Sequence, residues 1–183
     1  VKYKTNNPAY PHLILHELLH LELIEDAKAI GENSLFISNN SHKSKFIYLH
    51  SEFVKTLKKK NVSEESINNY LVALFNGINL QVFNTPIDLF IEDIINTRFK
   101  ALKPIQFYSL FTILSEGIEA TTRKDIVENS PKDILSISKI YNLVNALHFK
   151  NLFGLDLIES FKASNLISKK CYLTKYGIQI VTY

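Results

Sequence analysis

The feature that most constrains this chain is an apolar run from Pro11 to Asp26, PHLILHELLHLELIED, which carries two histidines and a glutamate in its middle. Leucine and isoleucine fall on nearly every side of a helix drawn through this run, and a helix that is apolar all round is expected to be buried. Burying polar side chains costs free energy unless a partner satisfies them. We therefore expect His16, Glu17 and His20 to have a partner.

The segment from His16 to His20 matches the pattern HExxH. Residues four apart lie one turn apart on one helix face, so two imidazoles can reach one metal ion about 2 Å from each nitrogen. Glu17 points to the side of that face, where it can contact a metal-bound water and act as general base. We expect His16 and His20 to bind Zn²⁺ and Glu17 to be catalytic. The alternative is a pair of core histidines that only make polar contacts.

A catalytic zinc site needs a third protein ligand and leaves a fourth position for water. The candidates that we favour lie far from the motif in the sequence. Asp88 and Glu92 form a pair four residues apart in an otherwise apolar helix that is expected to begin at Pro86. We expect one of these two acids to face the histidines, and the choice between them stays open. The alternatives are an acid in the first turn that balances the helix dipole, for Asp88, and a partly exposed surface acid, for Glu92. His12 is expected at the frayed start of the first helix, although it could extend the metal face.

HExxH followed by a helix with two acids four apart resembles the zincin metallopeptidases, especially the gluzincin branch typified by thermolysin. The resemblance implies that Asp88 binds zinc and that Glu92 supports a histidine ligand, although the usual order in that branch is Glu then Asp. The pattern N-x-x-x-D-x-x-I-E also resembles a group of uncharacterised bacterial metallopeptidases that pair HExxH with a downstream Asp. These likenesses cover only the motif helix and residues 84–96.

Helix signals along the chain predict a mainly α (α+β) single domain over residues 1–183 with a few short strands. The resemblance implies that its helical core is zincin-like. The motif helices are expected at 11–30 and 86–99, and a helical C-terminal half over 104–163. Zincins place a β-sheet before the motif helix, and little of this chain precedes it. The resemblance therefore implies a fragment without the upstream sheet, or a minimal variant.

Shorter signals fill in the remaining elements. The runs 34–38 and 45–49 lean towards β-structure and are expected to pair as a hairpin, and the C-terminal tail also leans towards β-structure. Residues 51–61 have the pattern of an amphipathic surface helix. Gly117 and Gly154 are expected to end two of the later helices.

Composition limits the classes of function. A net charge of +3 is too small to indicate a nucleic-acid partner, and no apolar run reaches the roughly 18 residues that span a membrane. The single cysteine, Cys171, allows no internal disulfide, which favours a reducing, cytoplasmic location. The HExxH motif, the acid pair and the resemblance to zincins lead us to expect a zinc metallopeptidase acting on a peptide or protein substrate. The alternative is a non-catalytic zinc-binding or helical protein-interaction domain.

Overall fold

The computed structural model describes residues 7–32, 37–161, 171–174 and 177–180, and over these residues the chain is mainly helical, as predicted. The elements are α1 (Tyr10–Ala29), α2 (Asn40–Leu49), α3 (Ser51–Lys59), α4 (Glu64–Arg98), η1 (Lys100–Leu102), α5 (Lys103–Thr122), α6 (Lys124–Glu128), α7 (Lys132–Phe153), η2 (Ile158–Phe161), β1 (Cys171–Thr174) and β2 (Gly177–Ile180).

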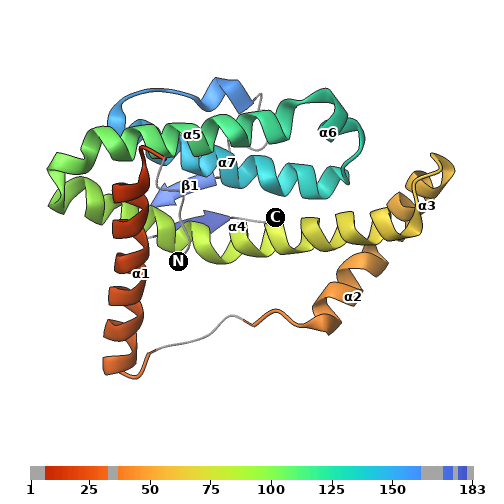
Figure 1. Ribbon diagram of the computed structural model, residues 1–183, viewed down its shortest axis with the longest axis horizontal. Helices are drawn as coiled ribbons and strands as arrows, with labels where there is room; N and C mark the ends of the chain where they lie inside the picture. Colours follow the sequence, from red (N-terminus) through yellow and green to blue (C-terminus); the bar gives the residue numbers. More distant parts are fainter. Residues whose placement is uncertain (1–6, 33–36, 162–170, 175–176, 181–183) are drawn as a thin grey trace.

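The longest of these helices, α4, runs across the whole molecule, and the other helices pack along it (Figure 1). Helices α2 and α3 lie at its N-terminal end, α7 runs beside it, and α1 crosses its C-terminal half. Helix α5 packs on α7 and also contacts α1 and α4. The C-terminal half of α4 is therefore the place where three other helices, α1, α5 and α7, come together.

Nine of the buried apolar side chains form three clusters, each between two helices. They are Leu114, Ala146 and Phe149 between α5 and α7; Leu19, Ile91 and Ile95 between α1 and α4; and Leu57, Ile67 and Leu71 between α3 and α4. The second cluster determines which face of α1 meets α4. That face also carries the histidines.

Pro86 lies inside α4, so the prediction that a separate helix begins there is wrong. The helix begins instead after Ser63, whose hydroxyl oxygen accepts a hydrogen bond of 3.2 Å from the backbone N–H of Ser66. A proline in a helix interior removes one backbone hydrogen bond and costs about 3 kcal/mol. Helix α4 nevertheless continues through Pro86, with α7 packed beside it and α1 packed across it. Asp88 therefore lies in mid-helix and does not balance a helix dipole.

The predicted hairpin of 34–38 with 45–49 is also wrong, because residues 45–49 belong to α2, while 34–36 lie outside the described residues. A capping box begins α2. The Asn39 side chain accepts a hydrogen bond of 3.1 Å from the His42 backbone N–H, and the His42 ring accepts one of 3.4 Å from the Asn39 backbone N–H. These local bonds satisfy the first backbone donors of the helix, which outweighs the β-preference of the following side chains.

The predictions for the surface helix, the C-terminal tail and the end at Gly154 agree with the structure. The surface helix is confirmed as α3, and the β-leaning tail forms an antiparallel hairpin where it is described, with Cys171 opposite Ile180. Helix α7 ends as predicted at Gly154, whose φ of 77° is left-handed and suits glycine. The helical C-terminal half is confirmed as far as residue 161, where η2 ends.

Helix α1 is buried on one face only, which corrects the expectation that it is buried all round. His12 and Leu19 are its buried residues, whereas Leu18 and Leu21 are more than half exposed. The reason is that α1 lies across the end of the bundle, where its main contacts come from α4 and α5 (Figure 1). Among the described helices, none combines the length and apolarity required to cross a bilayer.

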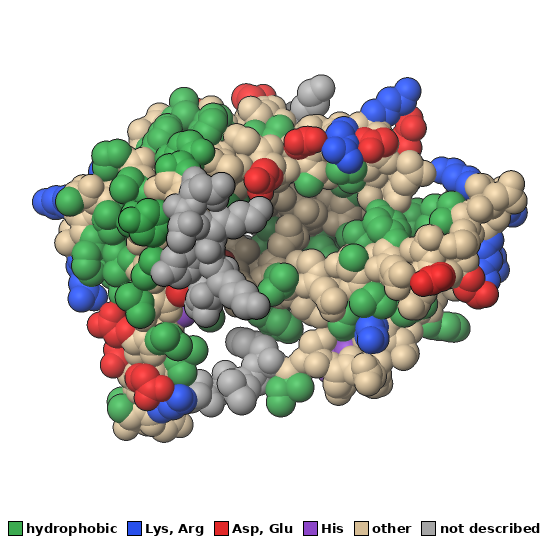
Figure 2. Space-filling model, viewed as in Figure 1, with side chains coloured by type: hydrophobic (Ala, Val, Ile, Leu, Met, Phe, Trp, Pro, Cys, Tyr) green, Lys and Arg blue, Asp and Glu red, His purple; other side chains and the backbone are tan. Residues whose placement is uncertain are grey.

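The face drawn in Figure 2 is hollowed between α7 and the N-terminal half of α4. A cavity of about 790 Å³ lies there, with mainly apolar walls that include Leu74, Ile78 and Ile134. This hollow is separate from the C-terminal half of α4, where the histidines lie.

Helix α5 continues through Gly117 to Thr122, beyond the end that the sequence predicts. A Cβ atom on Gly117 would lie 2.1 Å from Oδ1 and 2.8 Å from Cγ of Asn142 on α7. The Asn142 amide is held by a hydrogen bond of 2.8 Å to the backbone oxygen of Ser138. Glycine is therefore needed here for the close approach of α7, and it does not stop the helix.

Replacing Gly117 with alanine should destabilise the protein relative to the matched variant Gly77→Ala. A Cβ on Gly77, in the interior of α4, meets nothing within 4 Å, so alanine there should stabilise by about 0.5–1 kcal/mol. In Gly117→Ala the Asn142 side chain must turn away and lose its hydrogen bond, which costs about 1–3 kcal/mol. Urea unfolding should show a difference of that size between the two variants, and equal stabilities would contradict the close packing.

Candidate metal centre

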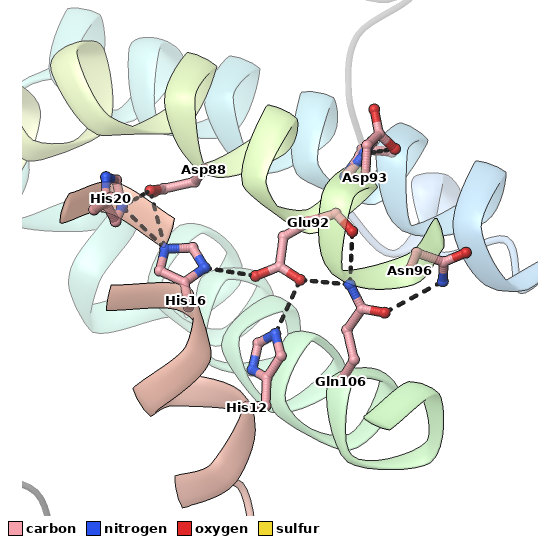
Figure 3. Close-up of polar contacts among 9 residues, drawn as sticks. His12, His16, His20, Asp88, Glu92, Asp93, Asn96 and Gln106 are labelled. Carbon is pink, nitrogen blue, oxygen red and sulfur yellow. Dashed lines mark hydrogen bonds and ion pairs between the residues drawn. The ribbon is translucent and has the colours of Figure 1, made fainter. Parts of the chain in front are cut away.

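Three histidines from α1 line up on the face that meets α4. His12, His16 and His20 are spaced by four residues, so they lie on one side of the helix, one turn apart (Figure 3). Leu19, which packs against Ile91 and Ile95, turns this face towards α4. The histidine face of α1 therefore lies against α4, as it must if an acid of α4 is to face the histidines.

One acid of α4 reaches the two histidines of the HExxH motif. Asp88 Oδ1 lies 3.0 Å from His20 Nε2 and 3.3 Å from His16 Nε2, and the two nitrogens are 3.1 Å apart (Figure 3). In a tetrahedral zinc site with bonds of 2.0–2.2 Å, neighbouring ligand atoms lie about 3.3–3.6 Å apart. The three atoms need to separate by only a few tenths of an ångström to surround one ion, so the donor set fits zinc.

The second acid, Glu92, lies behind His16. Its Oε1 is 2.8 Å from His16 Nδ1, and its Oε2 is 2.9 Å from His12 Nε2 and accepts a hydrogen bond of 2.7 Å from Gln106 Nε2. These are distances of short hydrogen bonds, and Glu92 is only 4% exposed. His12, His16 and Glu92 could also be grouped as metal ligands, but the amide donor of Gln106 already occupies the carboxylate. The geometry therefore favours Asp88 as the ligand and Glu92 as the support of His16.

The exposure of the two groups agrees with these roles. The side chains of His16, His20 and Asp88 are 16%, 23% and 37% exposed, so the converging atoms lie near the surface. His12, in contrast, is 1% exposed, and its Nδ1 is one of two buried side-chain atoms without a hydrogen-bond partner among the described residues. The buried group, His12 and Glu92, holds the helices together. The outer group, His16, His20 and Asp88, is accessible to solvent.

The charges of this site favour a cation. Burial by itself would lower the pKa of the His16 imidazole, but hydrogen bonds to Asp88 and Glu92 outweigh it and raise that pKa from 6.5 to about 9. Burial by itself would raise the pKa of the Glu92 carboxyl, but hydrogen bonds from His12, His16 and Gln106 lower it from 4.5 to about 2. Two carboxylates thus stabilise positive charge between them, and a divalent cation would take over the role of the proton on His16.

Glu17 lies beside this group, on the exposed side of α1. Together with His16 and Asp88 it lines a cavity of about 210 Å³ between α1, α4, α5 and α7. On the α7 side the cavity is lined by His148, whose Nε2 is 3.0 Å from Asp93 Oδ1. Glu17 is therefore placed where a molecule in the cavity can meet it.

Two residues of the site were not predicted from the sequence. His12 was expected at a frayed helix end but is among the most buried side chains, and its four-residue spacing from His16 was the available signal. Gln106 is fully buried against Glu92, and a single glutamine in the apolar start of α5 carries no signal of that contact.

No family model, curated protein or solved structure matches the chain.

The pKa values predict how the stability of chelator-treated protein depends on pH. Because the pKa of His16 rises from 6.5 to about 9 on folding, its contribution is fully present below pH 6.5 and is lost as the pH rises through 9. Because the pKa of Glu92 falls from 4.5 to about 2, its contribution is present above pH 4.5 and is lost as the pH falls through 2. The free energy of unfolding should fall by roughly 2–3 kcal/mol between pH 6.5 and 9.

Urea unfolding in a chelator at several pH values measures this change. The variant His16→Gln lacks the titrating ring and should show a flatter profile over the same range. The variant His50→Gln changes a histidine that binds Asp133 away from this site, and it should keep the native slope. A native profile that does not fall between pH 6.5 and 9 would disprove the proposed charge arrangement.

Proposed function

We propose that this chain is a zinc-dependent peptidase in which His16, His20 and Asp88 hold the metal and Glu17 acts as the base. The observation that carries the proposal is the convergence of three ligand atoms within 3.0–3.3 Å of one another, from two crossing helices. Nitrogen and carboxylate oxygen are the donors that zinc takes in hydrolytic enzymes.

The number of ligands supports a catalytic site over a structural one. Structural zinc sites usually close with four protein ligands, whereas catalytic sites use three and keep one position open. Within the described part of the chain, the outer group consists of two histidines and one acid, and Glu92 is engaged by hydrogen bonds behind it. The partial exposure of the three side chains gives solvent and substrate access.

When bound, zinc polarises a carbonyl group and lowers the pKa of a coordinated water. Glu17 follows His16 directly on α1 and lines the neighbouring cavity, so its carboxylate can accept a proton from the attacking water. Glu92 accepts a hydrogen bond from His16 Nδ1, which leaves the lone pair of Nε2 directed at the metal position. These roles agree with the resemblance to gluzincins, in which the first acid binds zinc and the second supports a histidine.

The cavity beside the site supports a peptide substrate with an apolar side chain. Leu89, Leu110, Leu114 and Phe149 are among the apolar residues that line it. Its volume of about 210 Å³ exceeds the roughly 150 Å³ of an engineered apolar cavity that binds benzene. A leucine or phenylalanine side chain of the substrate would fit there, with the neighbouring peptide bond near Glu17.

The purified protein should bind about one zinc ion per chain, measured by elemental analysis and by competition with a chelating dye. His20→Ala and Asp88→Asn remove ligands, so we expect each to lose more than the roughly 100-fold that outer-shell changes cost. The control Asp93→Asn changes an acid on the same helix that binds His148 instead. Native affinity in Asp88→Asn, or no zinc in the native protein, would refute the site.

Replacing Glu17 with glutamine should abolish most of the activity and leave the metal in place. The substitution keeps size and hydrogen bonding but removes the base, and loss of a general base costs about 10²–10⁴-fold in rate. Native protein and Glu17→Gln should be compared on a peptide library, with zinc measured in both. The control Glu25→Gln changes an acid of the same helix that is ion-paired with Lys28 at 2.7 Å.

The two variants and the native protein separate the possible outcomes. Equal cleavage by native protein and Glu17→Gln would exclude Glu17 as the base. Zinc binding without any cleavage by the native protein would favour a non-catalytic zinc-binding domain.

A further inference from the structure

Two amide side chains, the buried Gln106 and the half-buried Asn96, lie in series behind the metal ligands. Gln106 of α5 is fully buried, and its Nε2 donates hydrogen bonds of 2.7 Å to Glu92 Oε2 and 2.9 Å to the Glu92 backbone oxygen. On its other side, Gln106 Oε1 accepts a hydrogen bond of 3.2 Å from Asn96 Nδ2 (Figure 3). Three polar side chains from two helices thus form one continuous series that ends at the carboxylate next to His16.

The direction of each bond in this series is determined by the chemistry of its members. An ionised carboxylate accepts only, so the NH₂ group of Gln106 must face Glu92. If the amide were turned over, its oxygen would face the carboxylate and two acceptors would be buried against each other. Asn96 opposes that turn, because its NH₂ group donates to the oxygen of Gln106. The orientation of the glutamine amide is therefore held from both ends.

The orientation of Glu92 follows from that of Gln106. Gln106 and His12 together hold Oε2, so Oε1 is the oxygen that remains for His16 Nδ1. With a proton on Nδ1 directed at Oε1, the imidazole would hold a metal through Nε2, which faces Asp88 and His20. The ring plane and the tautomer of the metal ligand thus depend on a residue that lies two contacts away from the metal position.

We propose that Gln106, oriented by Asn96, is a positioning residue of the metal centre, which it serves by fixing the Glu92 carboxylate against His16. This inference rests on the proposed metal site. A glutamine that only packed between helices would be replaceable by methionine, which has a similar length and shape and no hydrogen-bond donor. The two roles therefore predict different behaviour of the bound metal.

The test compares Gln106→Met with the matched control Gln81→Met. Gln81 lies on α4, is partly buried and donates a hydrogen bond of 3.2 Å to Ser138 Oγ, away from the histidines. Zinc affinity is measured by competition with a chelator, and the ligand geometry by the visible absorption spectrum of the Co²⁺ form. Thermal unfolding in a chelator reports the purely structural effect of each change.

We expect Gln106→Met to bind zinc about 10- to 100-fold more weakly than the native protein and to alter the Co²⁺ spectrum. Gln81→Met should keep native affinity and spectrum. Asn96→Ala leaves Glu92 and Gln106 in place but frees the amide to turn, so it should change both readouts in the same direction by a smaller factor. This milder variant decides the question if Gln106→Met does not fold.

Native affinity and an unchanged spectrum in Gln106→Met, with only a lower unfolding temperature, would overturn the positioning role while leaving the metal site intact. If Gln106→Met does not fold, a native affinity and spectrum in Asn96→Ala would overturn it in the same way. Failure of the native protein to bind either metal would overturn the proposed site and the positioning role together. The outcomes therefore distinguish an error in this inference from an error in the proposed function.

Discussion

The Glu92 carboxylate is a buried charge at the point where three helices meet, and the arrangement of the site depends on it. Such a charge is tolerated only with several good hydrogen bonds, because its desolvation costs several kcal/mol. His12 and His16 of α1 and Gln106 of α5 supply those bonds. Each of these contacts joins α4 to another helix, so the requirement to satisfy one carboxylate also determines how α1 crosses α4.

The outer group follows from that crossing because both helices repeat their polar residues every four positions. When Glu92 lies between His12 and His16, the acid one turn earlier, Asp88, lies between His16 and His20. The same crossing thus produces two layers that share His16. The inner layer is buried and consists of hydrogen bonds, whereas the outer layer is partly exposed and has the spacing of metal ligands. Burial is what separates two acids that look equivalent in the sequence.

The continuity of α4 gives both layers a common support. Pro86 lies inside the helix, close to Asp88, and the helix still runs on to Arg98, with α7 packed beside it and α1 across it. The smaller cavity, of about 210 Å³, opens between these same helices, with Glu17 and Asp88 in its lining. A metal position, a base and an apolar subsite would then share one set of helices, which is the arrangement that the proposed peptidase requires.

The sequence by itself determined the features that depend on local spacing. The pattern HExxH on an apolar helix identified His16, Glu17 and His20, and two acids four apart identified Asp88 and Glu92, because i, i+4 residues share a helix face wherever the helix lies. The mainly helical fold followed from the same periodicity. Gly154 was recognised as a helix end because a left-handed residue is a local requirement.

Only the tertiary structure decided the features that depend on neighbours distant in the chain. Gly117 looked like a helix stop, but it is a point of close approach to Asn142, and Pro86 looked like a helix start, but it lies inside a helix packed along its length. The different burial and partners of Asp88 and Glu92, the burial of His12 and the contact of Gln106 with Glu92 were likewise decided by packing. Local spacing gives the direction of a side chain from its own helix, whereas its burial and its partner depend on which other helices cross there.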